Sequence, residues 1–197
     1  MLVIGMGHRA RQGKDTAALA MINAAPLELQ IRQYGFADAL KKEVWLACSR
    51  SGGQWNLIAH YKEAGLMPEW VVCEDPKPRT LLQWWGEWRR SQNPNYWVDR
   101  LRRTLEAHRP DVALITDVRH PNEIAFVKEY SGFNVKVTRT TRADIEVSEA
   151  HISERALSDF NGWDFYLEAA YRQELEQKAA ELFTDIWETH GLRSIEP

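Results

Sequence analysis

Four consecutive residues near the start of the chain, Gly13, Lys14, Asp15 and Thr16, combine flexibility, positive charge and oxygen ligands. They follow a short apolar run and open a segment rich in Ala and Leu. In a strand–turn–helix layout of this kind, backbone N–H groups and the positive end of the helix dipole form a cradle for polyphosphate. A lysine at this place reaches the β- and γ-phosphates. The segment therefore predicts a binding loop for a nucleoside triphosphate.

The loop departs from the standard spacing in two places. The glycine expected five residues before Gly13 is replaced by His8, and Gly7 stands one residue earlier. Magnesium is normally held by a Ser or Thr directly after the lysine, whereas here Asp15 intervenes before Thr16. An ordinary strand-to-helix turn is the alternative interpretation. The residues expected to bind ATP are Gly7, His8, Arg11, Gln12, Gly13, Lys14, Asp15 and Thr16.

A second candidate group follows the apolar run at residues 112–116. Asp117 comes directly after it, at the carboxyl end of an expected strand, where open parallel sheets bind their ligands. Arg119 follows two residues later and can pair with a phosphate through two hydrogen bonds. Phosphoryl transfer needs this kind of positioning and charge neutralisation. The alternative is a capping Asp and an exposed Arg at a strand-to-helix turn.

Two further arginines, Arg139 and Arg142, follow the expected strand at residues 133–138. They precede residues 143–150, a stretch typical of a flexible cover. A lid that brings arginine over the phosphates would exclude water and so prevent futile hydrolysis of ATP. Each arginine taken alone is equally compatible with an ordinary surface charge.

Strand-like and helix-like segments alternate along the chain, and they must position these residues. Alternation of this kind predicts crossover units and a parallel sheet covered on both faces, an α/β fold. Strands are expected at residues 2–5, 29–34, 112–116 and 133–138, with a weaker one near 164–167. Helices are expected at residues 14–23, 37–48, 80–90, 96–108, 121–130 and about 170–189.

Composition narrows the classes of protein that remain. A length of 197 residues fits one domain, with residues 49–78, rich in Gly and Pro, as an inserted lobe. The net charge of −3 argues against a dedicated nucleic-acid binder. No run approaches the ~18 apolar residues of a membrane span, and the first strand begins at once without a signal peptide, so a cytoplasmic protein is expected. The nine Trp residues are expected mainly to pack helices, although a subset could stack on a base.

Several separated motifs lie in a specific order along most of the chain. They are Gly13-Lys14-Asp15-Thr16; Phe36-Ala37-Asp38 with Leu40-Lys41; Arg79 with Leu81-Leu82-Gln83 and Gly86; Tyr96-Trp97-Val98; Asp117-Val118-Arg119 with Pro121-Asn122-Glu123; and His151-Ile152-Ser153-Glu154. In this order they resemble the phage-type deoxynucleoside monophosphate kinases of the P-loop kinase group. The resemblance implies a three-layer P-loop kinase fold with a mainly parallel five-stranded sheet, an inserted helical monophosphate-binding lobe and a lid at about residues 139–155.

The same resemblance implies an activity, a cofactor and residue roles. The activity is ATP- and Mg²⁺-dependent phosphorylation of a deoxynucleoside monophosphate to the diphosphate, in the cytoplasm (that of a host if the chain is phage-encoded). Magnesium would be handled by Asp15, Thr16 and Asp117. The catalytic set would be Lys14, Asp117, Arg119, Arg139 and Arg142. The residues facing the monophosphate would be Asp38, Lys41, Arg79, Gln83, Trp97, Arg119 and Glu123.

Other functions stay open on the sequence alone. A P-loop kinase with a different small acceptor would carry the same loop, and so would a nucleotide-binding protein that has lost catalysis. Single-stranded nucleic-acid binding through the region of Arg79 to Arg103 fits poorly with the negative net charge. The sequence leaves open the base accepted, tolerance of ribose, and whether the chain forms a homodimer.

Overall fold

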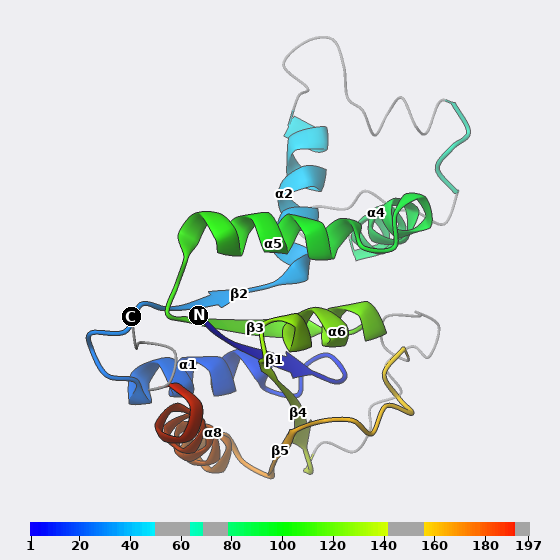
Figure 1. Cartoon of the computed structure of the whole chain (residues 1–197). Coiled ribbons are helices and arrows are strands. Elements are labelled where there is room, and N and C mark those ends of the chain that lie inside the picture. The colour runs from blue at the N-terminus through cyan, green and yellow to red at the C-terminus, as the bar shows by residue number, and fades with distance from the viewer. Residues whose placement is uncertain (50–63, 69–78, 142–155, 192–197) are drawn as a thin grey trace. The chain divides into compact units, whose positions relative to one another are not determined.

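A computed structural model describes residues 1–49, 64–68, 79–141 and 156–191 of the chain (Figure 1). The chain divides into two compact units. The first combines Met1–Gly35 with Arg102–Pro197, and the second is Phe36–Leu101. Arg142, the segment from His151 to Glu154 and most of the lobe expected at 49–78 lie outside the described residues.

The first unit is built on a five-stranded sheet in which every pairing is parallel. The strand order is β2-β3-β1-β4-β5, with the fully buried β1 at the centre. The predicted parallel α/β sheet is therefore confirmed. The strands are β1 (Leu2–Gly7), β2 (Ile31–Tyr34), β3 (Val112–Val118), β4 (Phe133–Arg139) and β5 (Phe165–Ala169).

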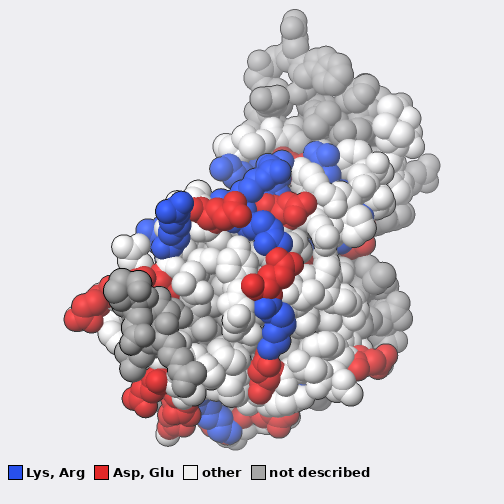
Figure 2. Space-filling model, in the orientation of Figure 1, with Lys and Arg blue, Asp and Glu red and all other residues white. Residues whose placement is uncertain are grey.

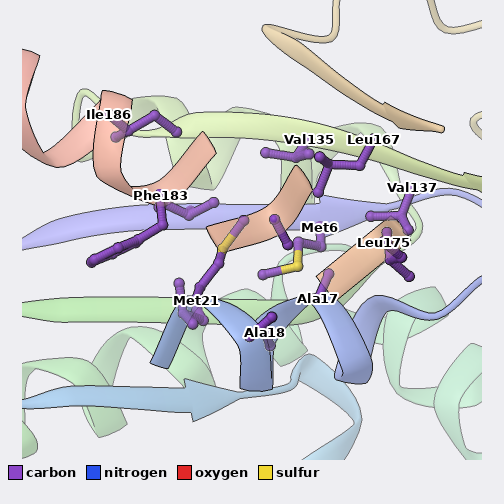
Figure 3. Close-up of a cluster of buried hydrophobic side chains, with 14 of the residues drawn as sticks. Met6, Ala17, Ala18, Met21, Val135, Val137, Leu167, Leu175, Phe183 and Ile186 are labelled. Carbon is purple, nitrogen blue, oxygen red and sulfur yellow. The ribbon is translucent and has the colours of Figure 1, made fainter. Parts of the chain in front are cut away.

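Helices α1 (Lys14–Ala24) and α8 (Arg172–Ile186) pack against each other on one face of this sheet, and a π-helical turn, η1 (Trp187–Gly191), follows α8. Alternate residues of the strands point to this face, because side chains along a strand have a period of two. The small side chains of α1 allow close approach, and larger side chains of α8 fill the remaining space. Figure 3 shows this core, with Met6, Val135, Val137 and Leu167 from the sheet, Ala17, Ala18 and Met21 from α1, and Leu175, Phe183 and Ile186 from α8.

Helix α6 (Pro121–Glu129) covers the opposite face of the sheet. Its approach is close, since a Cβ added to Gly5 of β1 would lie only 2.7 Å from Val127 Cγ2. Asn134 of β4 is fully buried beneath α6, and its Nδ2 donates to the carbonyl of Ile124 at 3.2 Å. A buried amide that makes such a bond escapes much of the desolvation cost of burial. The sheet is thus covered on both faces, as the sequence predicted.

The two central strands send their helices to opposite faces. The chain leaves β1 into α1 on one face, and it leaves β3, the neighbour of β1, into α6 on the other. Where adjacent strands diverge in this way, open parallel sheets bind ligands outside the carboxyl ends of the strands. The carboxyl ends of β1 and β3 are therefore the place in the first unit where a ligand is expected.

The second unit contains α2 (Phe36–Ser49), α4 (Arg79–Gln92) and the first part of α5 (Tyr96–His108). Trp85 and Trp97 are its largest buried side chains, and the indole N–H of Trp97 donates to the carbonyl of Gly86 at 3.2 Å. These two tryptophans pack helices together, as expected for most of the tryptophans in this chain.

The carboxylate of Glu43 joins α2, α4 and α5. Its Oε1 accepts from Trp85 Nε1 at 3.1 Å and from Arg89 Nε at 2.6 Å, and its Oε2 accepts from the Tyr96 hydroxyl at 2.9 Å. Arg100 Nη2 lies 3.9 Å from Glu43 Oε2. The Arg89 guanidinium also lies 4.8 Å from the Trp88 ring centroid, within cation–π range. One carboxylate therefore organises the polar contacts between α2, α4 and α5.

Charge on the visible surface is mixed rather than gathered by sign. Figure 2 shows acidic and basic side chains next to one another on the described part of this face. The first unit also contains ion pairs, such as that of Arg102 Nη2 with Glu129 Oε2 at 2.6 Å. Within the described ranges, none of the helices is both long enough and apolar enough to cross a membrane.

The Glu43→Gln substitution is expected to lower the free energy of unfolding of the second unit by about 1–3 kcal/mol, because it weakens hydrogen bonds to a charged group. Urea denaturation followed by tryptophan fluorescence measures the effect. Glu129→Gln is the matched control, since its ion pair is solvent-exposed and is expected to contribute less than about 1 kcal/mol. Equal losses in both variants would contradict the central role of Glu43.

Candidate phosphate-binding site

The turn between β1 and α1 has a glycine-like backbone at a residue that is not glycine. His8 has φ +91°, Arg11 has φ +62° and Gly13 has φ +99°. Only glycine adopts the first and last of these conformations without steric cost. His8 therefore takes the conformation that suits the first glycine of the standard spacing, while Gly7 is the last residue of β1. The loop begins at His8, so the spacing from it to Gly13 is the standard one.

The side chain of Lys14 folds back over this loop. It is only 7% exposed, and its Nζ donates to the carbonyls of Arg9 at 2.6 Å and His8 at 3.3 Å. An ammonium group held in this way lies beside the backbone that would surround a phosphate. Lys14 is thus placed as a phosphate-binding lysine requires, at the first residue of α1.

Two contacts tie the loop to the rest of the first unit. The buried Gln12 accepts from the backbone N–H of Arg139, at the carboxyl end of β4, with its Oε1 at 2.7 Å. On the other side, a Cβ at Gly13 would lie 2.6 Å from Leu175 Cδ2 of α8. A side chain at Gly13 would therefore require Leu175 to shift, in addition to the cost of a positive φ. The loop is consequently fixed against both β4 and α8.

The half-buried imidazole of His8 reports the electrostatic environment of the loop. Burial, together with the positive charges of Lys136, Arg9 and Lys14, lowers the pKa of His8 to about 4, and a hydrogen bond with the backbone of Val137 opposes this only in part. Burial by itself disfavours a charge of either sign, but the part of the shift that comes from Lys136, Arg9 and Lys14 reflects a positive potential that favours an anion. The loop therefore has both the backbone shape and the positive potential that a phosphate needs.

Asp15 lies in the first turn of α1 and is exposed, but its carboxylate is held in place. Gln33 Nε2 donates to Asp15 Oδ1 at 2.7 Å, and Thr116 Oγ1 donates to the same oxygen at 3.0 Å. The half-buried Thr16 follows Asp15 on the helix. Sequence reasoning singled out Asp15 and Thr16 and missed Gln33 and Thr116. The only signal for the missed pair was a polar residue near the end of each of two expected strands.

Asp117 lies where the pairing of β3 with β1 is irregular. Between Ile115 and Val118, β3 carries one more residue than the facing part of β1. Such bulges redirect side chains and are common beside active sites. The Asp117 carboxylate lies against the end of β2, since a Cβ at Gly35 would be 2.9 Å from its Oδ2. Asp117 is therefore at the predicted sheet edge, directly after the threonine that contacts Asp15.

Glu123 is buried at the start of α6. It is 1% exposed, and its Oε2 accepts from the backbone N–H groups of Arg119 at 2.7 Å and His120 at 3.1 Å. These contacts satisfy N–H groups at the start of α6. Helix capping thus accounts for Glu123, and this geometry adds no support for substrate binding. Arg119 itself is half-buried in the turn after β3.

The remaining predicted substrate residues belong to the second unit. Asp38 and Lys41 are exposed and form an ion pair on α2 at 3.5 Å. Trp97 is 2% exposed, so a contact with a base would require its side chain to emerge from the helical packing. Arg79 is exposed at the start of α4 and Gln83 is half-buried on the same helix. The other predicted site residues of the described ranges belong to the first unit, and they are Gly7, His8, Arg11, Gln12, Gly13, Lys14, Asp15, Thr16, Asp117, Arg119 and Arg139.

The acidic residues of the site fit a metal that arrives with a nucleotide. Among the described residues there is no group of three or more His, Cys, Asp or Glu side chains able to hold a metal ion. Mg²⁺ in nucleotide enzymes is typically held by one or two carboxylates together with phosphate oxygens and water. Asp15 and Asp117, both near the loop, meet this lesser requirement.

Comparison with known proteins adds no family to this description. No protein-family model matches the chain, and no curated protein matches it significantly.

Replacing His8 by glycine is expected to raise the free energy of unfolding by about 1 kcal/mol. A left-handed residue other than glycine costs about 1–3 kcal/mol, and relief of this cost is partly offset because glycine makes the unfolded chain more flexible. His8→Ala is the matched variant, since it removes the same ring and keeps the strained backbone. Urea denaturation compares the two. Equal stabilities would contradict a strained backbone at His8.

Stability is expected to fall as the pH drops from about 6.5 towards about 4, because His8 has a lower pKa in the folded chain than in the unfolded chain. The unfolded chain then takes up the proton first, so the stabilisation present at higher pH is lost. The slope from this one group is at most about 1.4 kcal/mol per pH unit, and less for a partly exposed ring.

Unfolding by urea across this pH range measures the loss. His8→Asn is expected to flatten the decline, because asparagine does not titrate in this range. A wild-type slope in His8→Asn would show that other groups cause the decline.

Proposed function

We propose that this chain is an ATP- and Mg²⁺-dependent kinase that phosphorylates a deoxynucleoside monophosphate to the diphosphate. One observation carries the proposal. The turn after β1 is left-handed at His8 and Gly13, and the Lys14 ammonium donates to a backbone carbonyl of this turn, that of Arg9. This is the arrangement that binds the phosphates of a nucleoside triphosphate in P-loop enzymes. The order of motifs along the chain supports the choice of acceptor.

The reaction needs no nucleophilic side chain. A phosphate oxygen of the monophosphate attacks the γ-phosphorus of ATP in line, the bond to the β,γ-bridging oxygen breaks, and ADP leaves. Backbone N–H groups of the loop and Lys14 bind the β- and γ-phosphates and offset the charge that moves onto the leaving oxygen. Magnesium, when bound with ATP, neutralises phosphate charge and helps to align the transferred group.

The charged residues around the loop have distinct parts in this scheme. Asp15, Thr16 and Asp117 would hold the metal with its waters, and Arg119 and Arg139 would stabilise the transferred phosphoryl group. For the acceptor, Arg79, Asp38, Lys41 and Gln83 stay predictions from the order of motifs. Arg142 stays a prediction, because it lies outside the described residues.

An acceptor panel tests the proposed activity directly. A coupled ADP-release assay with ATP, Mg²⁺ and each deoxy- and ribonucleoside monophosphate is expected to show turnover on at least one deoxynucleotide. Turnover on none of them, with ATP still bound in calorimetry, would favour a kinase for another small acceptor or a catalytically inactive nucleotide-binding protein.

The Lys14→Ala variant is expected to lose roughly 3–4 kcal/mol of transition-state stabilisation, about 10²–10³-fold in kcat, by analogy with removal of one preorganised donor. Lys178→Ala is the control, since that lysine is on α8 and pairs with Glu174 at 2.7 Å. Steady-state kinetics on the accepted monophosphate measures both. Activity of Lys14→Ala within about threefold of wild type would falsify the role of Lys14.

A further inference from the structure

The carboxylate of Asp15 belongs to a closed ring of hydrogen bonds. Gln33 and Thr116 both donate to its Oδ1, at 2.7 Å and 3.0 Å. The Gln33 amide also donates to Thr116 Oγ1 at 3.1 Å. The Thr116 hydroxyl therefore gives its proton to Asp15 and accepts one from Gln33, so the donors and acceptors of the ring match.

The sheet register explains why these three side chains meet. Gln33 of β2 is paired with Leu114 of β3, and Thr116 follows Leu114 by two positions. Side chains two positions apart on a strand share a face, and Leu114 belongs to the core that packs against α1. Gln33 and Thr116 therefore point to the face where the first turn of α1 presents Asp15.

The two hydrogen bonds leave the two carboxylate oxygens of Asp15 unequal. Both bonds end on Oδ1, and across the part of the chain that the structure describes no hydrogen bond to Oδ2 is present. An exposed aspartate samples several side-chain orientations, whereas two donors on one oxygen select a single orientation. A carboxylate held in this way is typical of metal sites, where partners behind the ligand fix its direction.

We propose that Gln33 and Thr116 are positioning residues that fix the Asp15 carboxylate and leave Oδ2 for the magnesium ion of a bound nucleotide or for one of its waters. The inference rests on the proposed function only in that the loop must bind a nucleotide. The competing explanation is a structural tie, in which these hydrogen bonds serve only to hold α1 against the sheet. A tie of that kind would affect stability and nucleotide binding with or without metal.

The test separates metal affinity from nucleotide affinity. Calorimetry with EDTA measures binding of metal-free ADP, and electron paramagnetic resonance measures free Mn²⁺ titrated into the protein–ADP complex. Thr116→Val removes the hydroxyl at nearly constant size, and Thr116→Ser restores it. Gln33→Leu removes the amide, with Gln177→Leu on α8 as its control. Asp15→Asn removes the carboxylate itself and therefore gives the loss of Mn²⁺ affinity against which the other variants are compared.

Thr116→Val and Gln33→Leu are expected to weaken Mn²⁺ binding about tenfold, while binding of metal-free ADP stays within about twofold of wild type. Thr116→Ser and Gln177→Leu are expected to have the wild-type affinity for both Mn²⁺ and metal-free ADP. Unchanged Mn²⁺ affinity in Thr116→Val and Gln33→Leu, or no rescue by Thr116→Ser, would overturn the proposal. So would an equal loss of metal-free ADP binding, which indicates a structural tie.

The outcome for the wild-type protein distinguishes this inference from the proposed activity. Metal-dependent ADP binding with the expected pattern of variants, but without phosphoryl transfer to any acceptor, would support the positioning role and reject the kinase. A wild-type protein that binds no ADP, with or without Mn²⁺, would reject both.

Discussion

The geometry of the whole candidate site depends on how the backbone turns from β1 into α1. This turn passes through the left-handed region at His8 and Gly13, and neither end can shift freely. The sheet fixes β1, whose neighbours on both sides are paired in parallel, and the packing of α8 against α1 fixes the start of the helix. Core packing in the first unit is therefore also what shapes the loop, because a strained backbone persists only where its surroundings determine it.

Electrostatics and backbone shape act together at this turn. Burial, together with the positive charges of Lys136, Arg9 and Lys14, lowers the pKa of His8 to about 4 and so keeps this histidine neutral near pH 7. The Lys14 ammonium donates to the carbonyls of His8 and Arg9. A phosphate would compete with these neutral carbonyl oxygens for the ammonium and would offer it a full negative charge.

Periodicity was enough to predict the elements but not their neighbours in space. The helix at Tyr96–His108 and the five parallel strands follow from apolar spacing and alternation. Strand order depends on which crossovers pack best, and that is a property of three-dimensional packing. For the same reason Gln33 and Thr116 escaped notice, since their contact with Asp15 spans 18 and 101 positions of the sequence. Residue type alone left Glu123 open, because a glutamate at the start of a helix suits both a cap and a ligand.

The case of His8 shows what a spacing rule measures at a phosphate-binding turn. Such rules count glycines because glycine alone adopts a positive φ cheaply. The physical requirement is the dihedral angle, and a histidine meets it here at a cost borne by the surrounding packing. Gly13 is different, because Leu175 of α8 occupies the space that a side chain would need. One position of the turn therefore tolerates substitution at the expense of strain, whereas the other is held to glycine by steric exclusion as well as by φ.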